Sequence, residues 1–398
     1  MQRRPLGLVG WVLLGLLTTA SSTSAADLGP VSVNLSGDLR LRSEYLDNAG
    51  FQDGNERWRQ RFRLRLGLVA DVTEHTTVGL RFASGAKSYP TSGNQTLDSE
   101  NLAKFDFPID RVFVRYQREA GPAVTTFYVG KFGHPFYTPT EIVWDGDLQP
   151  AGAAEVIEFK PMGITLALGQ YVIRESEQTT GKGSSVYVEQ FSWRGQSEPA
   201  AFGLGVAYYA VSNPVQVASD AKANNSDFLT NKNFGTCTVT NPGSCTGALS
   251  DFQMLNASAE VTLKQLPLPL KLVGEYVNNL GAKEAVVGGN SFGEENMAWL
   301  AAVYYGTAGQ QGDWRIGAGY AQIEADATVA SFNSDDLQQT NVNTIFTELR
   351  YQLASKISVY YDGYYQQRNN IDLARANVNA AVDDTTLYRH RVSLVAEF

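Results

Sequence analysis

Residues 58–72 read WRQRFRLRLGLVADV, and apolar and charged side chains alternate along this stretch. One set of alternate positions includes Trp58, Phe62, Leu64, Leu66, Leu68, Ala70 and Val72. The other set includes Arg59, Arg61, Arg63, Arg65 and Asp71. Because successive side chains of a β-strand point to opposite faces, this period of two predicts a strand with one oily face and one charged face.

The same alternation recurs along the chain and predicts a protein built from strands. Residues 31–45 show it again, with leucines on one face and charged side chains on the other. Further segments lie at 77–84, 109–118, 124–133, 151–160, 163–174, 184–194, 200–212, 252–264, 269–280, 295–307, 313–325, 341–353, 356–368 and 386–398. We therefore expect sixteen strands, an even number, in a chain of 398 residues.

The connections between these segments are alternately short and long, and this alternation predicts the fold class. Short connections lie at 74–76, 119–123, 161–162, 195–199, 265–268, 308–312 and 354–355. Long ones lie at 46–57, 85–108, 134–150, 213–251, 281–294, 326–340 and 369–385. Short turns on one rim and long loops on the other are typical of an outer-membrane barrel. We expect an all-β, transmembrane antiparallel β-barrel of about 16 strands, with short periplasmic turns and long external loops.

A soluble secreted sandwich or β-helix also alternates, but three features disfavour it. A soluble sheet rarely places four arginines in alternation on the face opposite its apolar one. Aromatic residues such as Tyr45, Trp58 and Tyr304 cluster at strand ends, as interfacial girdles require. The last strand is amphipathic and ends in Phe398, which resembles the assembly signal of bacterial outer-membrane proteins.

The N-terminus has the features of a secretory signal peptide. Arg3 and Arg4 precede an apolar stretch, Leu6–Leu17, and small residues follow from Ser21 to Ala26. About 12 apolar residues are too few for a membrane helix, which needs about 20. We expect residues 1–26 to be removed near Ala25 or Ala26, leaving 27–398 as one barrel in the outer membrane of a Gram-negative bacterium.

Composition excludes several classes of function. The chain is 43% hydrophobic and holds only 2 Cys and 3 His, so we expect no cofactor and no metal site. Its formal charge is −9, and removing Arg3 and Arg4 makes it −11. A net acidic chain is a poor binder of nucleic acid.

Several segments resemble a known family. They are SGDLRLRSEY (36–45), RFRLRLGLVADVTEHTTVGLRFASG (61–85), IDRVFVRYQRE (109–119), VGKFGHPF (129–136) and VWDGDLQPAG (143–152), and they look like the putative-porin family of Gram-negative bacteria. The resemblance implies a passive, water-filled channel with a loop folded into its lumen. Its partners would be outer-membrane lipid, small hydrophilic solutes or ions, and the barrel-assembly machinery through the C-terminal strand. By analogy it could assemble as a homotrimer.

The charged strand faces predict which residues line the pore. Counting from the periplasmic strand ends puts many of these arginines about 20 Å up the wall, on strands that neighbour one another once the barrel closes. The expected lumen-facing arginines are Arg40, Arg42, Arg59, Arg61, Arg63, Arg65, Arg81, Arg111, Arg115, Arg389 and Arg391. The alternative is that they are only solvated wall residues paired with Asp38, Glu44 and Asp71.

The third long loop is the candidate constriction. Residues 134–150 read HPFYTPTEIVWDGDLQP, and the prolines and the DGD turn indicate a loop. If it folds inward, Glu141, Asp145 and Asp147 face the arginines and create a transverse field. The alternative is an external lid.

Other functions compete with the channel. His134 with Asp145 or Asp147 is the one pairing that could serve a barrel enzyme, but we expect a polar loop residue and no enzyme. A purely structural or adhesive barrel gives no reason for an arginine-lined lumen.

Cys237 and Cys245, in the loop 213–251, are expected to form one disulfide.

Two charge counts conflict over ion selectivity. The acidic total favours cations, whereas the arginines favour anions at the narrowest point. We expect much of the acid in loops beyond a Debye length, about 8 Å at physiological salt, from the constriction. These residues are Asp98, Glu100, Glu284, Glu294, Glu295, Asp335, Asp336, Asp383 and Asp384. We therefore expect a weak to moderate anion preference or a filter for dipolar solutes, with a phosphate or organic-anion channel as the alternative.

Overall fold

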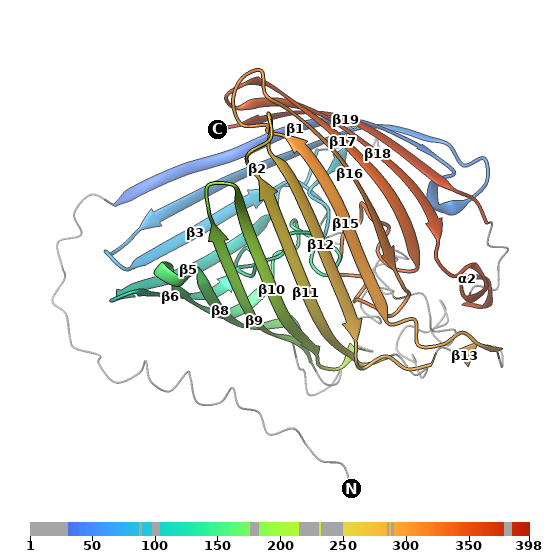
Figure 1. The fold of residues 1–398 in the computed structure, drawn as a ribbon, viewed down its shortest axis with the longest axis horizontal. Coiled ribbons are helices and arrows are strands. Elements are labelled where there is room, and N and C mark those ends of the chain that lie inside the picture. Colours follow the sequence, from blue (N-terminus) through green and yellow to red (C-terminus); the bar gives the residue numbers. More distant parts are fainter. Residues whose placement is uncertain are drawn as a thin grey trace, which may run out of the picture.

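Sixteen long antiparallel strands form one closed barrel (Figure 1). The computed structural model describes residues 31–86, 90–97, 104–175, 183–214, 231, 250–284, 286–287, 290–377 and 384–398. The long strands are β1 (Ser32–Asp47), β2 (Arg57–Asp71), β3 (Thr76–Ala83), β5 (Ile109–Ala120), β6 (Ala123–Lys131), β7 (Ala151–Phe159), β8 (Ile164–Arg174), β9 (Ser184–Gln196), β10 (Ala200–Val211), β11 (Phe252–Leu263), β12 (Leu270–Asn279), β15 (Met297–Gly306), β16 (Trp314–Ile323), β17 (Val342–Ala354), β18 (Ile357–Arg368) and β19 (Leu387–Glu397). The predicted strand number and fold class are confirmed.

Short elements occupy parts of the long connections. The two-residue strand β4 (Gln95–Thr96) pairs with β2 and adds a seventeenth strand to the sheet. Strands β13 (Val286–Val287) and β14 (Asn290–Ser291) form a small separate ribbon. The helical elements are η3 (Ala49–Phe51), η4 (Lys160–Met162) and α2 (Ile371–Asn377). In the described part of the chain, no helix has the length and apolar character to cross a membrane.

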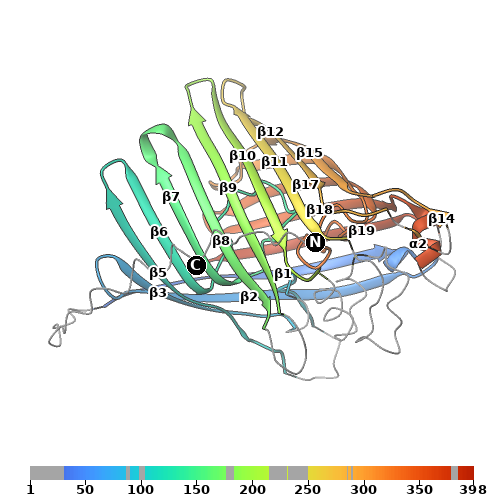
Figure 2. The same cartoon turned by 90° about the horizontal axis from the view of Figure 1, so that it is seen from below.

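The barrel closes where its first and last strands meet. Strand β1 pairs antiparallel with β19 from Asp38, opposite Glu397, to Asp47. Gly37 and Phe398 exchange two backbone hydrogen bonds of 2.9 and 3.0 Å, and a Cβ on Gly37 would lie 2.6 Å from the Phe398 ring. Figure 2, turned by 90° from Figure 1, shows β1 beside β19 in one continuous wall. The final residue thus completes the hydrogen bonding of the seam.

The alternating side chains of each strand face either the interior of the barrel or its outer surface. On β1 and β2 the apolar positions face outward, and Leu35 and Trp58 are 64% and 66% exposed. Aromatic pairs lie near both ends of the strands: the rings of Trp299 and Tyr320 are 5.1 Å apart, and those of Tyr305 and Trp314 are 6.0 Å apart. An apolar belt between aromatic residues is the surface that a membrane barrel presents to lipid.

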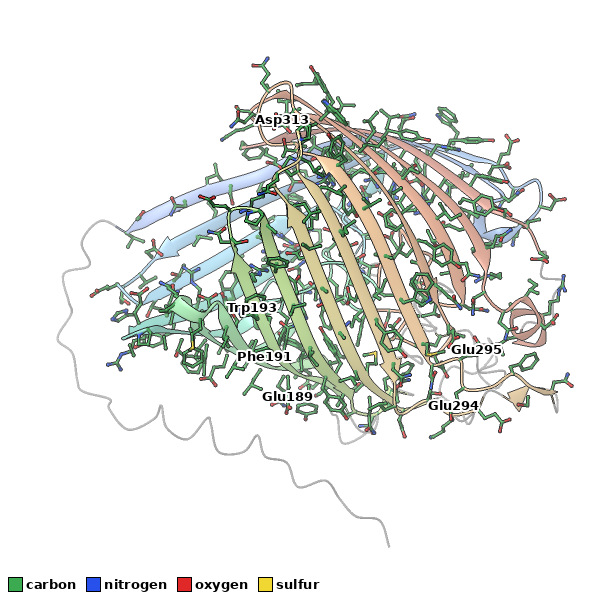
Figure 3. All side chains as sticks on the ribbon, in the orientation of Figure 1. Glu189, Phe191, Trp193, Glu294, Glu295 and Asp313 are labelled. Atoms are coloured by element: carbon green, nitrogen blue, oxygen red, sulfur yellow. The ribbon has the colours of Figure 1, made fainter. Side chains whose placement is uncertain are left out.

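The two rims differ as the sequence predicted. Short turns, such as 121–122 between β5 and β6 and 355–356 between β17 and β18, lie at one rim. Figure 3 shows Asp313, in the turn before β16, at this rim, and Glu294 and Glu295 at the opposite one. Residues 1–26, Cys237, Cys245 and most of 213–251 lie outside the described residues, so the signal peptide and the disulfide stay predictions.

Candidate functional site

The inner faces of β1 and β2 bring like charges together. Arg40 on β1 is directly opposite Arg63 on β2, and Arg42 is opposite Arg61. Like charges at directly opposed positions repel, so this wall needs carboxylates to be stable. The register supplies them at the neighbouring positions, where Asp38 faces Arg65 and Glu44 faces Arg59.

Each of these two carboxylates holds two arginines. Asp38 accepts from Arg65 Nε at 2.5 Å and from Arg63 Nη2 at 3.0 Å. Glu44 is buried against Arg59 and lies 3.6 Å from Arg61 Nη1. Such bidentate and shared contacts fix the planes of the guanidinium groups, which makes the wall rigid. Asp71, the third expected partner, instead accepts a hydrogen bond from the Thr77 hydroxyl at 3.0 Å.

The connection between β6 and β7, residues 132–150, lies inside the barrel, and we call it L3. It touches the inner faces of three distant strands. Asp147 lies 3.3 Å from both Arg63 and Arg65 of β2. The Tyr137 backbone N–H donates to Gln190 of β9 at 2.7 Å, and the Thr140 hydroxyl donates to Glu275 of β12. L3 therefore spans the interior from one wall to the other.

An aromatic cluster holds L3 in place. The His134 ring centre lies 4.6 Å from those of both Phe136 and Trp144, and the Tyr171 ring of β8 lies 5.8 Å from Trp144. His134 is buried, which lowers its pKa to about 3, so the ring is neutral at neutral pH. Both of its nitrogens lack a hydrogen-bond partner in the described structure. Within the described residues, His134 is therefore a weak base without the carboxylate partner that orients a catalytic histidine.

The three acidic residues of L3 have different environments. Burial raises the pKa of Asp147, but Arg63 and Arg65 outweigh it and hold the pKa below its usual value. Burial raises the pKa of Glu141 to about 7, and Asp336 adds to the rise. Burial and the neighbouring Glu141 raise the pKa of Asp145 as well. Asp147 is thus the L3 carboxylate whose pKa is lowered, and it is charged at neutral pH.

A second connection also folds inward, and the sequence did not predict it. Residues 324–341 between β16 and β17, which we call L7, pack against L3. The Asp145 N–H donates to the Phe332 carbonyl at 2.7 Å, and the Ser334 hydroxyl donates to Glu141 at 3.1 Å. The rings of Trp144 and Phe332 lie 5.3 Å apart. L3 and L7 thus form one joined layer inside the barrel.

The expectation that Asp335 and Asp336 lie far from the arginines was wrong, because L7 folds into the barrel. Asp336 forms ion pairs with Arg391 and, at 3.2 Å, with Arg389. Burial raises its pKa, but Arg391, Arg42 and Arg389 lower it well below the usual value. Residues 325–332, ADATVASF, include small apolar residues that are unusual for an exposed loop. This pattern could have indicated that L7 packs inside the barrel.

Some of the predicted arginines have no carboxylate partner. Among the ion pairs of the described residues, none involves Arg40, Arg42, Arg111 or Arg115. Arg40 donates to the Asn94 side chain at 2.7 Å, and Arg111 donates to Gln149 of L3 at 2.8 Å. Arg42 and Arg115 donate to the hydroxyls of Ser393 and Thr77, each at 3.0 Å.

The remaining predicted arginines are paired. Arg81 lies 2.5 Å from Asp110, and Arg391 lies 3.4 Å from Asp362. With Asp38, Glu44, Asp147 and Asp336, these carboxylates are fewer than the eleven predicted arginines. Four of the eleven arginines, Arg40, Arg42, Arg111 and Arg115, therefore have no ion-pair partner among the described residues.

Comparison with known proteins agrees with this architecture. A family described as "Putative porin" matches the chain over residues 30–172 and 164–384. The chain belongs to this porin family. The resemblance to this family that the sequence motifs indicated is confirmed. By family and fold it is an outer-membrane porin, a class of membrane channels that are not enzymes.

Solved structures resemble the chain in fold. The high-pH structure of Pseudomonas putida OprB is 10% identical, with 92% of this chain and 94% of that chain covered and a TM-score of 0.55. A mutant of the Rh. blastica porin is 10% identical, with 92% of this chain and 100% of that chain covered and a TM-score of 0.46. No curated protein sequence matches the chain.

Proposed function

We propose that this porin lets small hydrophilic solutes and ions diffuse passively through a water-filled pore whose arginine wall favours anions. The observation that carries the proposal is the set of wall arginines without an ion-pair partner among the described residues, of which Arg40 and Arg111 are bound to neutral side chains. Charged side chains along a pore act directly on passing ions. A positive excess at the narrowest level therefore enriches anions there.

L3 and L7 would define that narrow level. Asp147 of L3 and Asp336 of L7 both contact arginines of the wall, so positive and negative charges meet across a short distance. Opposed charges create a transverse field that orients a dipolar solute. The two loops would then narrow the path without sealing it.

The alternative is a channel that prefers one class of anion, such as phosphate or an organic carboxylate. The guanidinium groups of Arg40, Arg42, Arg111 and Arg115 favour it, because a planar guanidinium binds such anions in bidentate fashion. A preferred anion would saturate the conductance, whereas passive diffusion would keep conductance proportional to concentration.

Single-channel recording on the purified protein tests the proposal. We expect a linear current–voltage relation and a conductance that rises in proportion to KCl concentration. Conductance that levels off with phosphate but not with chloride would favour the anion-specific alternative. Purified protein that inserts without conducting would rule out the passive pore.

We also propose that residues 1–26 are removed on export, that Cys237 and Cys245 pair, and that Phe398 is read by the barrel-assembly machinery. Intact mass of the mature protein, measured with and without reduction and alkylation, tests the first two. Truncation of Phe398 should lower the yield of folded barrel in cells, and normal yield would contradict the third.

A further inference from the structure

The inner faces of β16 and β17 carry two further arginines, apart from those predicted to line the pore. Arg315 is the second residue of β16, and the register sets it directly opposite Arg350 of β17. Their chain neighbours Ile316 and Leu349 are exposed on the outer face of the barrel. Because side chains alternate along a strand, both arginines point into the lumen.

These arginines lie between the joined layer of L3 and L7 and the short-turn rim. L3 touches Glu275 of β12, which faces Leu300 of β15. Tyr304 lies four residues further along β15, about 13 Å closer to the short-turn rim along the strand. Figure 3 shows Asp313, two residues before Arg315, at this rim. A solute that has passed the layer therefore meets this part of the wall before it leaves the barrel.

Each of the two guanidinium groups lies over a tyrosine ring of the adjacent strand. The guanidinium carbon of Arg315 is 5.2 Å from the ring centre of Tyr304, and that of Arg350 is 4.2 Å from the ring centre of Tyr360. Gly317 provides the room for one ring, because a Cβ there would lie 2.4 Å from Tyr304. Stacking uses the face of a guanidinium and leaves the N–H groups at its edge available to an anion.

A single carboxylate holds both guanidinium groups in place. Glu348 accepts a hydrogen bond from Arg315 Nε at 2.8 Å and lies 2.8 Å from Arg350 Nε. The nearby Asp362 is paired with Arg391 at 3.4 Å. Two positive charges therefore share Glu348, and the two Nη atoms of Arg350 have no hydrogen-bond partner among the described residues.

Both arginines can be reached from the lumen. The side chains of Arg315 and Arg350 are 29% and 32% exposed, although they point inward. Tyr360 covers one face of the Arg350 guanidinium, so the face left to the lumen is a flat cationic surface. Such a surface can stack on an aromatic ring, and a second guanidinium beside it can bind a carboxylate.

We propose that Arg315 and Arg350, supported by Tyr304 and Tyr360, form a binding site for aromatic carboxylates at the short-turn mouth of the pore. The ring of the solute stacks on the Arg350 guanidinium, and its carboxylate accepts hydrogen bonds from Arg315. Glu348 is a positioning residue that holds the two groups side by side. The inference rests on the proposed pore and names the class of anion that this part of the wall holds.

Block of the KCl current by two carboxylates tests the site. Benzoate and cyclohexanecarboxylate carry the same charge and are similar in size, but only benzoate is planar and aromatic. We expect benzoate to reduce the single-channel current of the wild type in a saturable way. Its half-blocking concentration should be roughly two- to five-fold lower than that of cyclohexanecarboxylate, the difference that one exposed contact between a guanidinium and a ring provides.

Three variants separate stacking from charge. Arg350→Lys keeps the positive charge but removes the flat guanidinium, so the two half-blocking concentrations should become equal. Arg315→Gln should weaken block by both carboxylates, because each loses the partner of its charged group. Lys271→Gln is the matched control, since it removes a lumen cation, paired with Glu260 at 2.7 Å on neighbouring strands, without changing either arginine. It should keep the preference for benzoate.

Either of two results would overturn the proposal. One is equal block of the wild type by benzoate and cyclohexanecarboxylate, and the other is an undiminished benzoate preference in Arg350→Lys. A normal current in KCl alone would then leave the proposed pore standing, whereas a wild type that carries no current would refute the pore itself.

Heat-modifiable gel mobility verifies that each variant is a folded barrel. If Arg350→Lys does not fold, Tyr360→Leu takes its place, because it removes the ring that holds the Arg350 guanidinium flat. It should reduce the benzoate preference, and a full preference in that variant would contradict the proposed site.

Discussion

Asp147→Asn removes the one L3 carboxylate that directly touches the arginine wall. Its oxygens lie 3.3 Å from Arg63 and 3.3 Å from Arg65, and these arginines keep it ionised. The substitution keeps the size of the side chain and its place in L3. It therefore changes the charge at this level while largely preserving the shape.

The expected magnitude follows from Coulomb's law. A unit charge about 8 Å from a passing ion, in a medium of dielectric constant about 40 to 80, contributes about 0.5 to 1 kcal/mol. Losing that repulsion should raise anion permeability by roughly two- to six-fold, and the anion-to-cation permeability ratio should rise further because cations lose an equal attraction. The effect should shrink as salt screens the charge.

The assay is the zero-current potential of single channels across a salt gradient. Glu348→Gln is the matched control, because Glu348 bridges Arg315 and Arg350 on the wall strands and its loss leaves L3 intact. We expect a larger shift toward anions for Asp147→Asn than for the control. Equal shifts, or a shift toward cations, would refute the placement of Asp147 at the constriction.

Other predictions concern pH, His134 and the seam. Glu141, whose pKa is raised to about 7, loses its proton as pH rises from about 5 to 8, so anion preference should fall over this range, and Glu141→Gln should weaken that dependence. An equal pH dependence in the variant would show that other groups cause it. His134→Phe should fold and conduct like the wild type, since the imidazole is neutral and its nitrogens have no hydrogen-bond partner among the described residues, and lost conductance would reveal a polar role. Gly37→Val should reduce the heat-resistant folded fraction on gels, because its Cβ would lie 2.4 Å from the Arg65 carbonyl oxygen, and an unchanged fraction would show that the seam can adjust.

The strands could be predicted from the sequence because the alternation of a barrel strand is a local pattern. Alternation in residues 58–72 determines which side chains point inward, and the register then pairs Arg63 with Arg40. The terminal Phe398 was informative for the same reason, since closing the barrel requires an amphipathic last strand. These features depend only on the period of two and on nearest-neighbour strands.

The interior was harder to predict because it depends on contacts between residues far apart in the chain. Nothing local shows that Phe332 packs on Trp144, or that Asp336 meets Arg391. Most acidic loop residues face water, so no local pattern indicates that these lie inside the barrel.

The most direct test of the account compares wild type with the double variant Arg40→Gln and Arg111→Gln. These two arginines have only neutral side-chain partners, Asn94 and Gln149, so their charge is not cancelled by an ion pair. The measurement is the zero-current potential of each protein across the same KCl gradient. The account predicts an anion-selective wild type and a clear shift toward cations in the variant. A cation-selective wild type, or a variant with an unchanged potential, would contradict it.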